Sequence, residues 1–226
     1  LFDAPNSLFY SIGQQGIIVF LARLFSEAAV GIYSYTNRIL LTPVLFFSSS
    51  FSQVMYQKLS ILKNKDNEQF HRLMVKSTNN VFYYSVIPFL MFVFAAKYYV
   101  PVLFGDDWVE LYKYMYVMAP YSLMVLMSAA FTNVFKIDDK QEYALVLKIV
   151  FVVSRVMIIF MGASLGWGIL KTLLIFSVVS VISTLLNYIV YFSLHSRKVP
   201  HCLISFVFIA IIIYGFVVNE FNIVLI

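Results

Sequence analysis

The sequence has little charge. Only 12% of its 226 residues are Asp, Glu, Lys or Arg, whereas a soluble domain carries about 25%. Hydrophobic residues make up 62%, the mean hydropathy is +0.86, and apolar runs of about 20 residues recur along the chain, long enough to cross a bilayer. These runs do not alternate as the strands of a membrane barrel would. The composition therefore excludes an ordinary soluble domain and predicts a polytopic α-helical membrane protein.

Residues and motifs that carry catalytic chemistry are also scarce. The single Cys202 excludes an intrachain disulfide, and His71, His195 and His201 are not spaced as metal ligands. The sequence contains no nucleophile–base pair, no HExxH motif and no glycine-rich phosphate loop. We therefore predict that the protein is not an enzyme, and that it has no catalytic residues, no metal site and no cofactor.

Seven apolar runs are long enough to span the membrane. They are Pro5–Leu24, Gly31–Tyr56, Asn79–Val100, Tyr114–Phe135, Tyr143–Leu165, Trp167–Phe192 and Cys202–Val218. The expected fold is an all-α membrane helix bundle of about seven transmembrane helices. It forms one domain over residues 1–226, because no linker separates off a soluble domain. The only sizeable hydrophilic connection is Lys58–Ser77, for which a helix on the membrane surface and a solvated loop both stay open.

Basic residues are concentrated in alternate connections. Nine Lys and Arg side chains lie in the second, fourth and sixth connections, against four in the others. The nine are Lys58, Lys63, Lys65, Arg72, Lys76, Lys136, Lys140, Arg197 and Lys198. Such connections face the cytoplasm, so the second span runs from outside at Gly31 to inside at Tyr56. This bias explains the net charge of +5 without nucleic acid as a partner.

The second span, Gly31–Tyr56, carries a cation within its apolar sequence. Arg38 at the centre of a membrane helix would cost about 2.5–3.5 kcal/mol, so the protein should provide a polar environment for it. Several polar side chains fall within about 100° of one another on this helix. They are Ser34, Arg38, Thr42, Ser49 and Gln53. This pattern predicts that one face of the helix forms a wall of an aqueous or ligand-filled cavity.

Further polar residues lie inside other spans. Lys148 and Arg155 share a face of the fifth span about 10 Å apart along its axis, and Gln14 lies on a polar face of the first. The ionisable groups at depth are all cationic, which favours an anionic ligand such as a phosphate or an acidic sugar. The candidate substrate-binding residues are therefore Arg38, Arg155 and Lys148 for the anion, and Gln14 and Gln53 for sugar hydroxyls.

Two of these patterns have a simpler explanation that stays open. Lys148 lies near the cytoplasmic end of its span and could extend to the lipid headgroups instead. The sixth span carries a line of small polar residues, which are often a packing surface between membrane helices. That line consists of Ser177, Ser180, Thr184, Asn187 and Tyr191.

Four short motifs resemble a known family. They are Pro5-Asn6-Ser7; Gly31-Ile32-Tyr33-Ser34-Tyr35 leading to Arg38 and Pro43; Ser52-Gln53-Val54-Met55-Tyr56 before a basic connection; and Leu103-Phe104-Gly105-Asp106-Asp107-Trp108. With them, the sequence resembles the C-terminal half of Wzx-type polysaccharide or O-antigen flippases. These belong to the multidrug/oligosaccharidyl-lipid/polysaccharide exporter superfamily. The similarity extends from Pro5 to Ile149, and beyond Phe151 it is one of hydropathy only.

This resemblance implies two helical lobes around a central cavity, with this chain as a fragment that forms most of the C-terminal lobe. It implies alternating-access transport of an undecaprenyl-pyrophosphate-linked oligosaccharide across the bacterial inner membrane, for surface polysaccharide, lipopolysaccharide and O-antigen biosynthesis. The expected partners are the lipid bilayer and the lipid-linked oligosaccharide, with the polysaccharide polymerase machinery as a possible third. The alternatives are a multidrug exporter of the same superfamily and a membrane-embedded polysaccharide polymerase or ligase.

Overall fold

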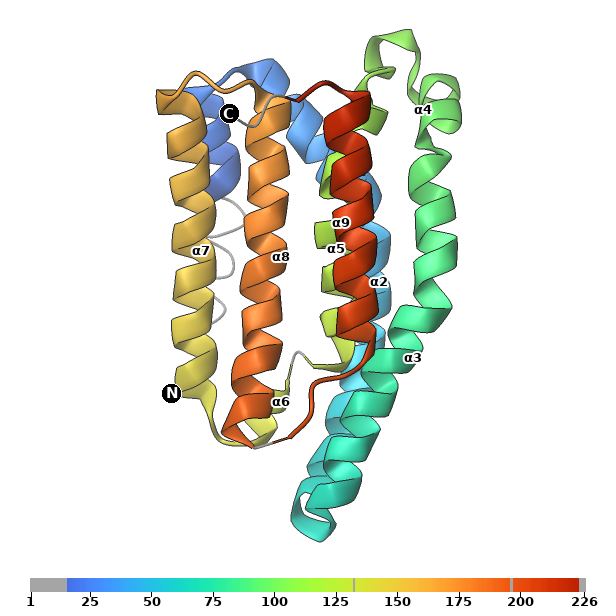
Figure 1. Ribbon diagram of the computed structural model, residues 1–226, viewed down its shortest axis with the longest axis vertical. Helices are drawn as coiled ribbons and strands as arrows, with labels where there is room; N and C mark the ends of the chain where they lie inside the picture. Colours follow the sequence, from blue (N-terminus) through green and yellow to red (C-terminus); the bar gives the residue numbers. More distant parts are fainter. Residues whose placement is uncertain (1–15, 132, 196, 224–226) are drawn as a thin grey trace.

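A computed structural model describes residues 16–131, 133–195 and 197–223, which contain helices and no strand (Figure 1). This confirms the predicted all-α class. Residues 16–24 are helical. The elements that follow are α2 (Glu27–Lys65), α3 (Asn67–Phe94), α4 (Ala96–Phe104), η1 (Asp106–Trp108), α5 (Leu111–Met127), η2 (Ser128–Ala130), α6 (Val134–Ile137), α7 (Gln141–Ser164), α8 (Ile169–Leu194) and α9 (Cys202–Glu220).

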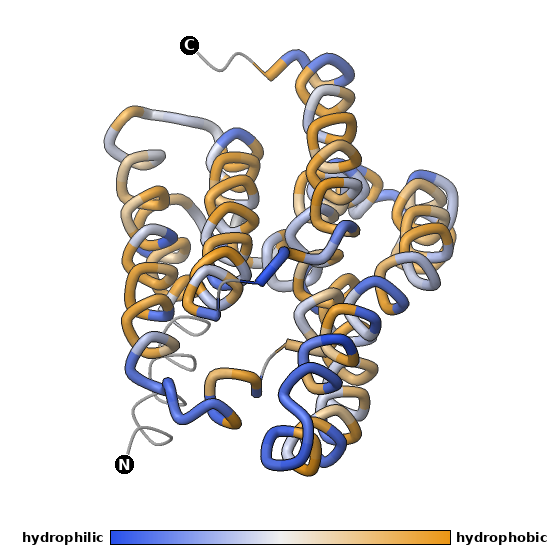
Figure 2. Tube along the Cα trace, turned by 60° about the horizontal axis from the view of Figure 1, so that its bottom comes forward, coloured by the Kyte–Doolittle hydropathy of each residue, from blue (hydrophilic) through white to orange (hydrophobic). Residues whose placement is uncertain are grey.

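The number of membrane-spanning helices is close to the prediction. Within the described residues, five helices are long and apolar enough to cross a membrane, or six if α3 and α4 form one bent span. The first predicted span, Pro5–Leu24, lies mostly outside the described residues. The chain is therefore a multi-pass membrane protein. Hydrophilic residues gather at the ends of its helices, most of all around the α2–α3 turn (Figure 2).

The prediction for the Lys58–Ser77 connection is wrong. Neither a surface helix nor a loop forms there, because α2 and α3 continue into a helical hairpin that turns at Asp66. The Asp66 carboxylate caps α3 by accepting hydrogen bonds from the backbone N–H groups of Glu68 and Gln69, each at 2.9 Å. Apolar residues of the hairpin are buried at the helix interface, which stabilises both extensions. They are Leu59, Phe70 and Met74.

Two other predicted spans are broken in the structure. The span predicted as Asn79–Val100 begins twelve residues earlier, at Asn67, and bends by 57° between α3 and α4. The span predicted as Tyr114–Phe135 is regular only to Met127, after which it continues as the short elements η2 and α6. Hydropathy marks apolar length and does not register a change of direction, which explains both differences.

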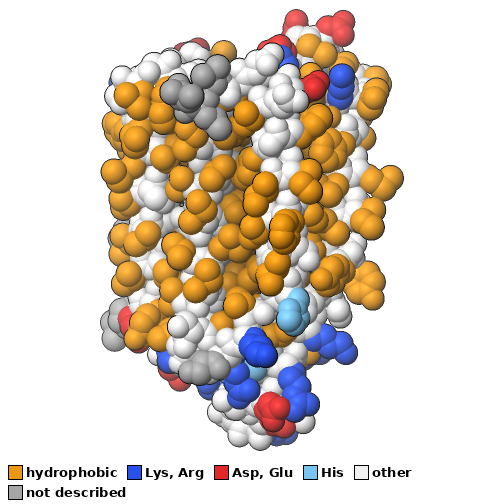
Figure 3. Space-filling model, in the orientation of Figure 1, with side chains coloured by type: hydrophobic (Ala, Val, Ile, Leu, Met, Phe, Trp, Pro, Cys, Tyr) orange, Lys and Arg blue, Asp and Glu red, His pale blue; other side chains and the backbone are white. Residues whose placement is uncertain are grey.

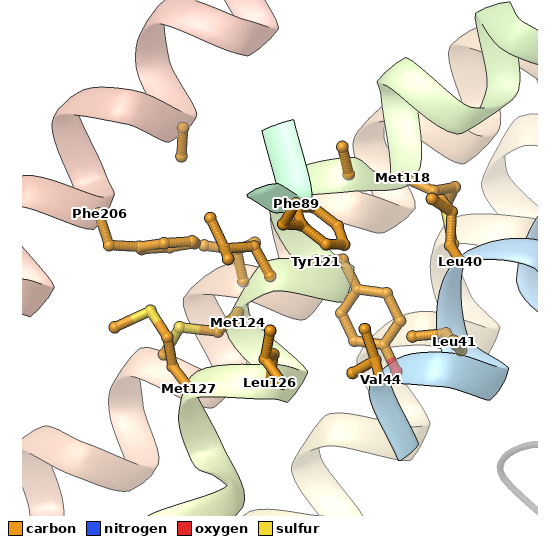
Figure 4. Close-up of a cluster of buried hydrophobic side chains, with 14 of the residues drawn as sticks. Leu40, Leu41, Val44, Phe89, Met118, Tyr121, Met124, Leu126, Met127 and Phe206 are labelled. Atoms are coloured by element: carbon orange, nitrogen blue, oxygen red, sulfur yellow. The ribbon is translucent and has the colours of Figure 1, made fainter. Parts of the chain in front are cut away.

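The centre of the bundle is α5. Fourteen of its 17 residues are buried, as expected for a helix that is apolar on all sides. Its side chains pack against those of α2, α3 and α9 (Figure 4). The labelled part of this core comprises Leu40, Leu41, Val44, Phe89, Met118, Tyr121, Met124, Leu126, Met127 and Phe206. The helix that holds the bundle together is thus α5, and α2 packs against it through Leu40, Leu41 and Val44.

By contrast, α7 lies at the edge of the bundle beside α8 (Figure 1). Only Arg155, Ile159 and Gly162 of this helix are buried, and its exposed side chains are mostly apolar. Hydrophobic side chains form a broad band across the face of the molecule seen in Figure 3. An apolar surface of this extent is typical of contact with lipid and not with water.

α7 and α8 approach each other closely at Gly162. A Cβ atom at this position would lie 2.7 Å from Cγ2 and 3.1 Å from Cβ of Thr172. The Thr172 side chain is held in place because its hydroxyl donates a 3.1 Å hydrogen bond to the carbonyl of Gly168. The contact therefore requires glycine, since small residues allow membrane helices to approach closely.

We predict that Gly162→Ala destabilises the protein by about 1–3 kcal/mol, the usual cost of overpacking a core. Thermal unfolding of the purified protein in detergent measures this. The control is Gly215→Ala in α9, where no atom lies within 4 Å of the added methyl group and no loss is expected. Combining Gly162→Ala with Thr172→Ala should restore the stability of the Thr172→Ala single variant. An unchanged melting temperature for Gly162→Ala would contradict the packing described here.

Candidate functional site

A cavity of about 560 Å³ lies within the bundle. Its walls come from α2, from α5 and the segment that joins it to α6, from α6 itself, and from α7 and α8. Its polar lining consists of Ser48, Ser49 and Ser52 of α2, Ser128 and Asn133, Lys148 of α7, and Thr184, Asn187 and Tyr188 of α8. This cavity therefore brings hydroxyl, amide and cationic groups together at one place between the membrane helices.

Local hydrogen bonds hold this polar lining in place. The Asn133 amide donates a 2.9 Å hydrogen bond to the Ser52 hydroxyl, which ties the chain before α6 to α2. On α8, Thr184 donates to the carbonyl of Ser180 at 2.9 Å, and Asn187 donates to that of Ser183 at 2.8 Å. Positions fixed in this way suit a binding site, because a rigid lining loses less entropy on binding.

The polar line predicted on α8 serves two purposes. Thr184 and Asn187 line the cavity, whereas Ser177 and Ser180 are fully buried in packing contacts. Ser177 shares a 2.9 Å hydrogen bond with the Tyr214 hydroxyl of α9, and Ser180 donates to the carbonyl of Phe176 at 2.7 Å. Both interpretations left open by the sequence therefore apply, each to a different part of the helix.

Arg155 lies directly behind the cavity wall. Its side chain is 1% exposed, and its guanidinium carbon lies 5.0 Å from the ring centre of Tyr121, 4.7 Å from that of Phe151 and 4.2 Å from that of Phe176. Tyr121 and Phe151 themselves line the cavity. Within the described part of the chain, Nε and Nη2 of Arg155 have no hydrogen-bond partner. The rings of Tyr121 and Phe151 thus lie between this buried cation and the cavity.

The two predicted cations of α7 therefore belong to one region. Lys148 lines the cavity and Arg155 lies about 10 Å further along the same helix, behind two of the lining rings. Aromatic faces stabilise a guanidinium by cation–π attraction, which is stronger where water is excluded. The sequence predicts the cations from their spacing, but not the rings, because Tyr121 and Phe176 come from other helices.

The remaining predicted site residues lie elsewhere. Arg38 is exposed on α2 and does not line this cavity. It lies seven and eleven residues before Leu45 and Ser49, two lining residues, and so on the same face of α2. Gln53 is exposed one turn beyond Ser49. Gln14 lies outside the described residues. Arg38 therefore lies on the same face of α2 as the cavity-lining residues, but it does not line the cavity together with Lys148.

The sequence did not indicate a buried ionic cluster at the basic end of the bundle. The carboxylate of Asp138, at the end of α6, pairs with Lys63 of α2 and accepts a hydrogen bond from the Tyr191 hydroxyl. His195 Nε2 lies 3.1 Å from the same carboxylate, and the Asp138 side chain is fully buried. The partners are 53 to 75 residues away in the sequence. In the sequence, Asp138 is one of two adjacent acidic residues between Lys136 and Lys140, and nothing there marks it as buried.

Comparison with known proteins bears on the first half of the chain. Residues 5–113 match the model of a family described as polysaccharide biosynthesis protein. This match supports a relationship to polysaccharide exporters, as the sequence motifs predicted, and the motifs themselves lie inside it. No curated protein and no solved structure matches the chain.

The match to the polysaccharide biosynthesis family includes only part of the site. Arg38, Gln53 and the serines of α2 lie within residues 5–113, whereas Lys148 and Arg155 lie beyond them. The cavity is therefore formed where the matched segment meets the helices that follow it.

Proposed function

We propose that this protein transports a lipid-linked oligosaccharide across the bacterial inner membrane, as Wzx-type flippases do, by alternating access and without enzymatic activity. The observation that carries the proposal is the cavity of about 560 Å³, with polar side chains and Lys148 in its lining, between helices whose outer surfaces are apolar. The similarity of residues 5–113 to polysaccharide biosynthesis proteins supports the class of cargo.

The lining of the cavity suits a sugar linked to a phosphate. Serine hydroxyls and the amides of Asn133 and Asn187 offer hydrogen bonds to sugar hydroxyls, and Lys148 offers a charge to an anion. An undecaprenyl pyrophosphate carries such an anion, and its chain would remain in the lipid. Arg155 adds positive potential from behind Tyr121 and Phe151, in surroundings that screen charge poorly.

The position of the cations suggests an order of contact. If the basic connections face the cytoplasm, Lys148 lies near the loading side. Arg38 lies about 16 Å from Ser49 along α2, towards the opposite side. We propose that Lys148 meets the anionic group first, and that Arg38 meets it late in the crossing.

Two alternatives have less support. A multidrug exporter of the same superfamily would use a carboxylate within the membrane for ion coupling. In the described residues, the buried carboxylate Asp138 is already paired with Lys63. A membrane-embedded polymerase or ligase would require catalytic side chains in a large outer loop. Here the connection between α4 and α5 is short and contains Asp106, Asp107 and Glu110.

The test is surface polysaccharide in cells whose own copy of the gene is replaced by variants. We expect Lys148→Gln to reduce export about 10-fold or more, because charge-assisted hydrogen bonds contribute about 1.5–3 kcal/mol, and Lys148→Arg to retain most of it. Arg38→Ala should reduce export in the same assay. The control is Lys97→Gln, which removes an exposed cation of α4. Normal export by Lys148→Gln at wild-type membrane abundance would refute the role of the cavity.

A further inference from the structure

A second pocket, of about 430 Å³, lies at the basic end of the bundle, between α3 and the connection from α8 to α9. It does not share a lining residue with the larger cavity. Four Lys and Arg side chains, two histidines and one acidic side chain line it. They are Arg72, Lys76, Arg197, Lys198, His71, His201 and Glu68. The pocket therefore carries a net positive charge that the proposed transport does not explain.

Most of this charge is uncompensated. Glu68 pairs with Arg72, but Lys76, Arg197 and Lys198 make no ion pair within the part of the chain that the structure describes. His71 is only 5% exposed, and its Nδ1 has no hydrogen-bond partner there. A buried polar atom without a partner is costly, so an occupant that supplies a hydrogen bond or a negative charge would be stabilised.

The pocket has a fixed frame. The backbone N–H of Cys202, at the start of α9, donates a 3.2 Å hydrogen bond to the side-chain oxygen of Asn79 on α3. This bond joins the two walls of the pocket. It also places the N-terminal end of a 19-residue helix beside it, and that end of a helix favours an anion. The binding groups are thus held together without an occupant.

The pocket lies at the level of the membrane surface. It is placed where α8 ends and α9 begins, and Lys and Arg side chains gather directly below the hydrophobic band on this face (Figure 3). Along α3, Lys76 and Asn80 of the pocket are followed one turn apart by Tyr84, which is 81% exposed, and then by Ile87, which is 66% exposed. This helix face therefore changes from cationic to apolar over about 16 Å. The order matches that of an anionic phospholipid, whose charged headgroup is followed by apolar acyl chains.

We propose that this pocket binds the phosphate headgroup of an anionic membrane lipid in the cytoplasmic leaflet, with the acyl chains lying along the exposed face of α3. Basic pockets beside membrane helices recognise such headgroups because their Lys and Arg side chains attract the negative charge of the phosphate. The site is separate from the transport cavity, so a bound lipid would fix the α2–α3 hairpin against the α8–α9 connection without occupying the substrate path.

Native mass spectrometry of the full chain in detergent tests this proposal, with phosphatidylglycerol, phosphatidylcholine of the same chains, and inorganic phosphate as probes. Phosphatidylglycerol should bind the wild type at least about 10-fold more tightly than phosphatidylcholine. Each basic residue should contribute about fivefold, so the double variant Lys76→Gln, Arg197→Gln should lose about 25-fold. The matched control is Lys58→Gln, Lys65→Gln, which removes two exposed cations of α2 at the same end and should change affinity less than twofold.

Three outcomes would overturn the proposal. Equal losses of phosphatidylglycerol affinity in both double variants would mean that the net charge of the basic end attracts lipid without a defined pocket. Equal affinity for the two lipids would mean that no anion is recognised. Binding of inorganic phosphate as tight as that of phosphatidylglycerol would assign the pocket to a soluble anion. None of these measurements depends on transport. The lipid-binding proposal can therefore fail while the proposed transport function holds, and the reverse.

Discussion

Replacing Arg155 by Met is expected to stabilise the protein and to reduce polysaccharide export about 10-fold or more. The guanidinium is buried, and two of its nitrogens lack a hydrogen-bond partner in the described part of the chain. A cation inside a membrane helix costs about 2.5–3.5 kcal/mol, and attraction to three aromatic rings offsets only part of this. Met fills a similar volume and leaves the rings of Tyr121, Phe151 and Phe176 in contact with a side chain.

The expected gain in the free energy of unfolding is about 1–2 kcal/mol, in line with other buried charges replaced by apolar residues. For a chain of this size it corresponds to a rise in melting temperature of about 2–8 °C. Export should nevertheless fall about 10-fold or more, because the cavity loses the positive potential behind its wall. Thermal unfolding in detergent and surface polysaccharide in cells give the two measurements.

Two variants control this experiment. Arg155→Lys keeps the charge and should retain part of the export. Ile159→Met changes the next buried residue of α7 at similar volume, so it should cost less than about 1.5 kcal/mol and leave export unchanged. If Arg155→Met lowered the melting temperature and export stayed normal, Arg155 would be a structural residue, and its assignment to the transport site would be wrong.

Replacing Asp138 by Ala should destabilise the protein, whereas Arg155→Met should stabilise it. The substitution removes the carboxylate that Lys63, Tyr191 and His195 share. It leaves the buried hydroxyl of Tyr191 without its acceptor. We expect a loss of about 3 kcal/mol, the lower end of the range for breaking a buried ion pair, because Lys63 is partly exposed and can turn to water. The melting temperature should then fall by about 6–12 °C.

The adjacent residue provides the control. Asp139 is exposed and has a φ of 53°, a backbone conformation that Asn also tolerates. Asp139→Asn therefore removes a charge from the same turn without strain, and should change stability by less than about 0.5 kcal/mol. Equal effects of Asp138→Ala and Asp139→Asn would show that the cluster contributes nothing beyond net charge.

The fold was predictable to the extent that the membrane determines it. Apolar runs of about 20 residues become spanning helices because no other backbone arrangement satisfies its hydrogen bonds in lipid. The α2–α3 hairpin beyond the membrane was not predictable in this way. Its helices depend on the cap at Asp66 and on contacts such as that of Leu59 with the facing helix, and hydropathy along one segment does not contain these.

The site was predictable only where its residues share a helix. Lys148 and Arg155 are seven residues apart, so their common face follows from helical geometry. The ring of Tyr121 and the partners of Asp138 come from distant helices. Their positions follow from how the helices pack, which composition and spacing do not specify. Arg38 shows the limit of this approach: it lies on the face of α2 that the sequence predicts, but the packing of the helices leaves it outside the cavity.

The length of α2 has a mechanical consequence. Its 39 residues extend about 58 Å, whereas the hydrocarbon of a bilayer is about 30 Å thick. About half of the helix therefore stands outside the hydrocarbon, as part of the hairpin with α3, while Ser48, Ser49 and Ser52 of the same helix line the cavity. A tilt of about 10° would move a point 28 Å beyond the pivot by about 5 Å. The hairpin could thus act as a lever arm: a force applied at this basic end of the bundle would be transmitted along α2 to the cavity wall.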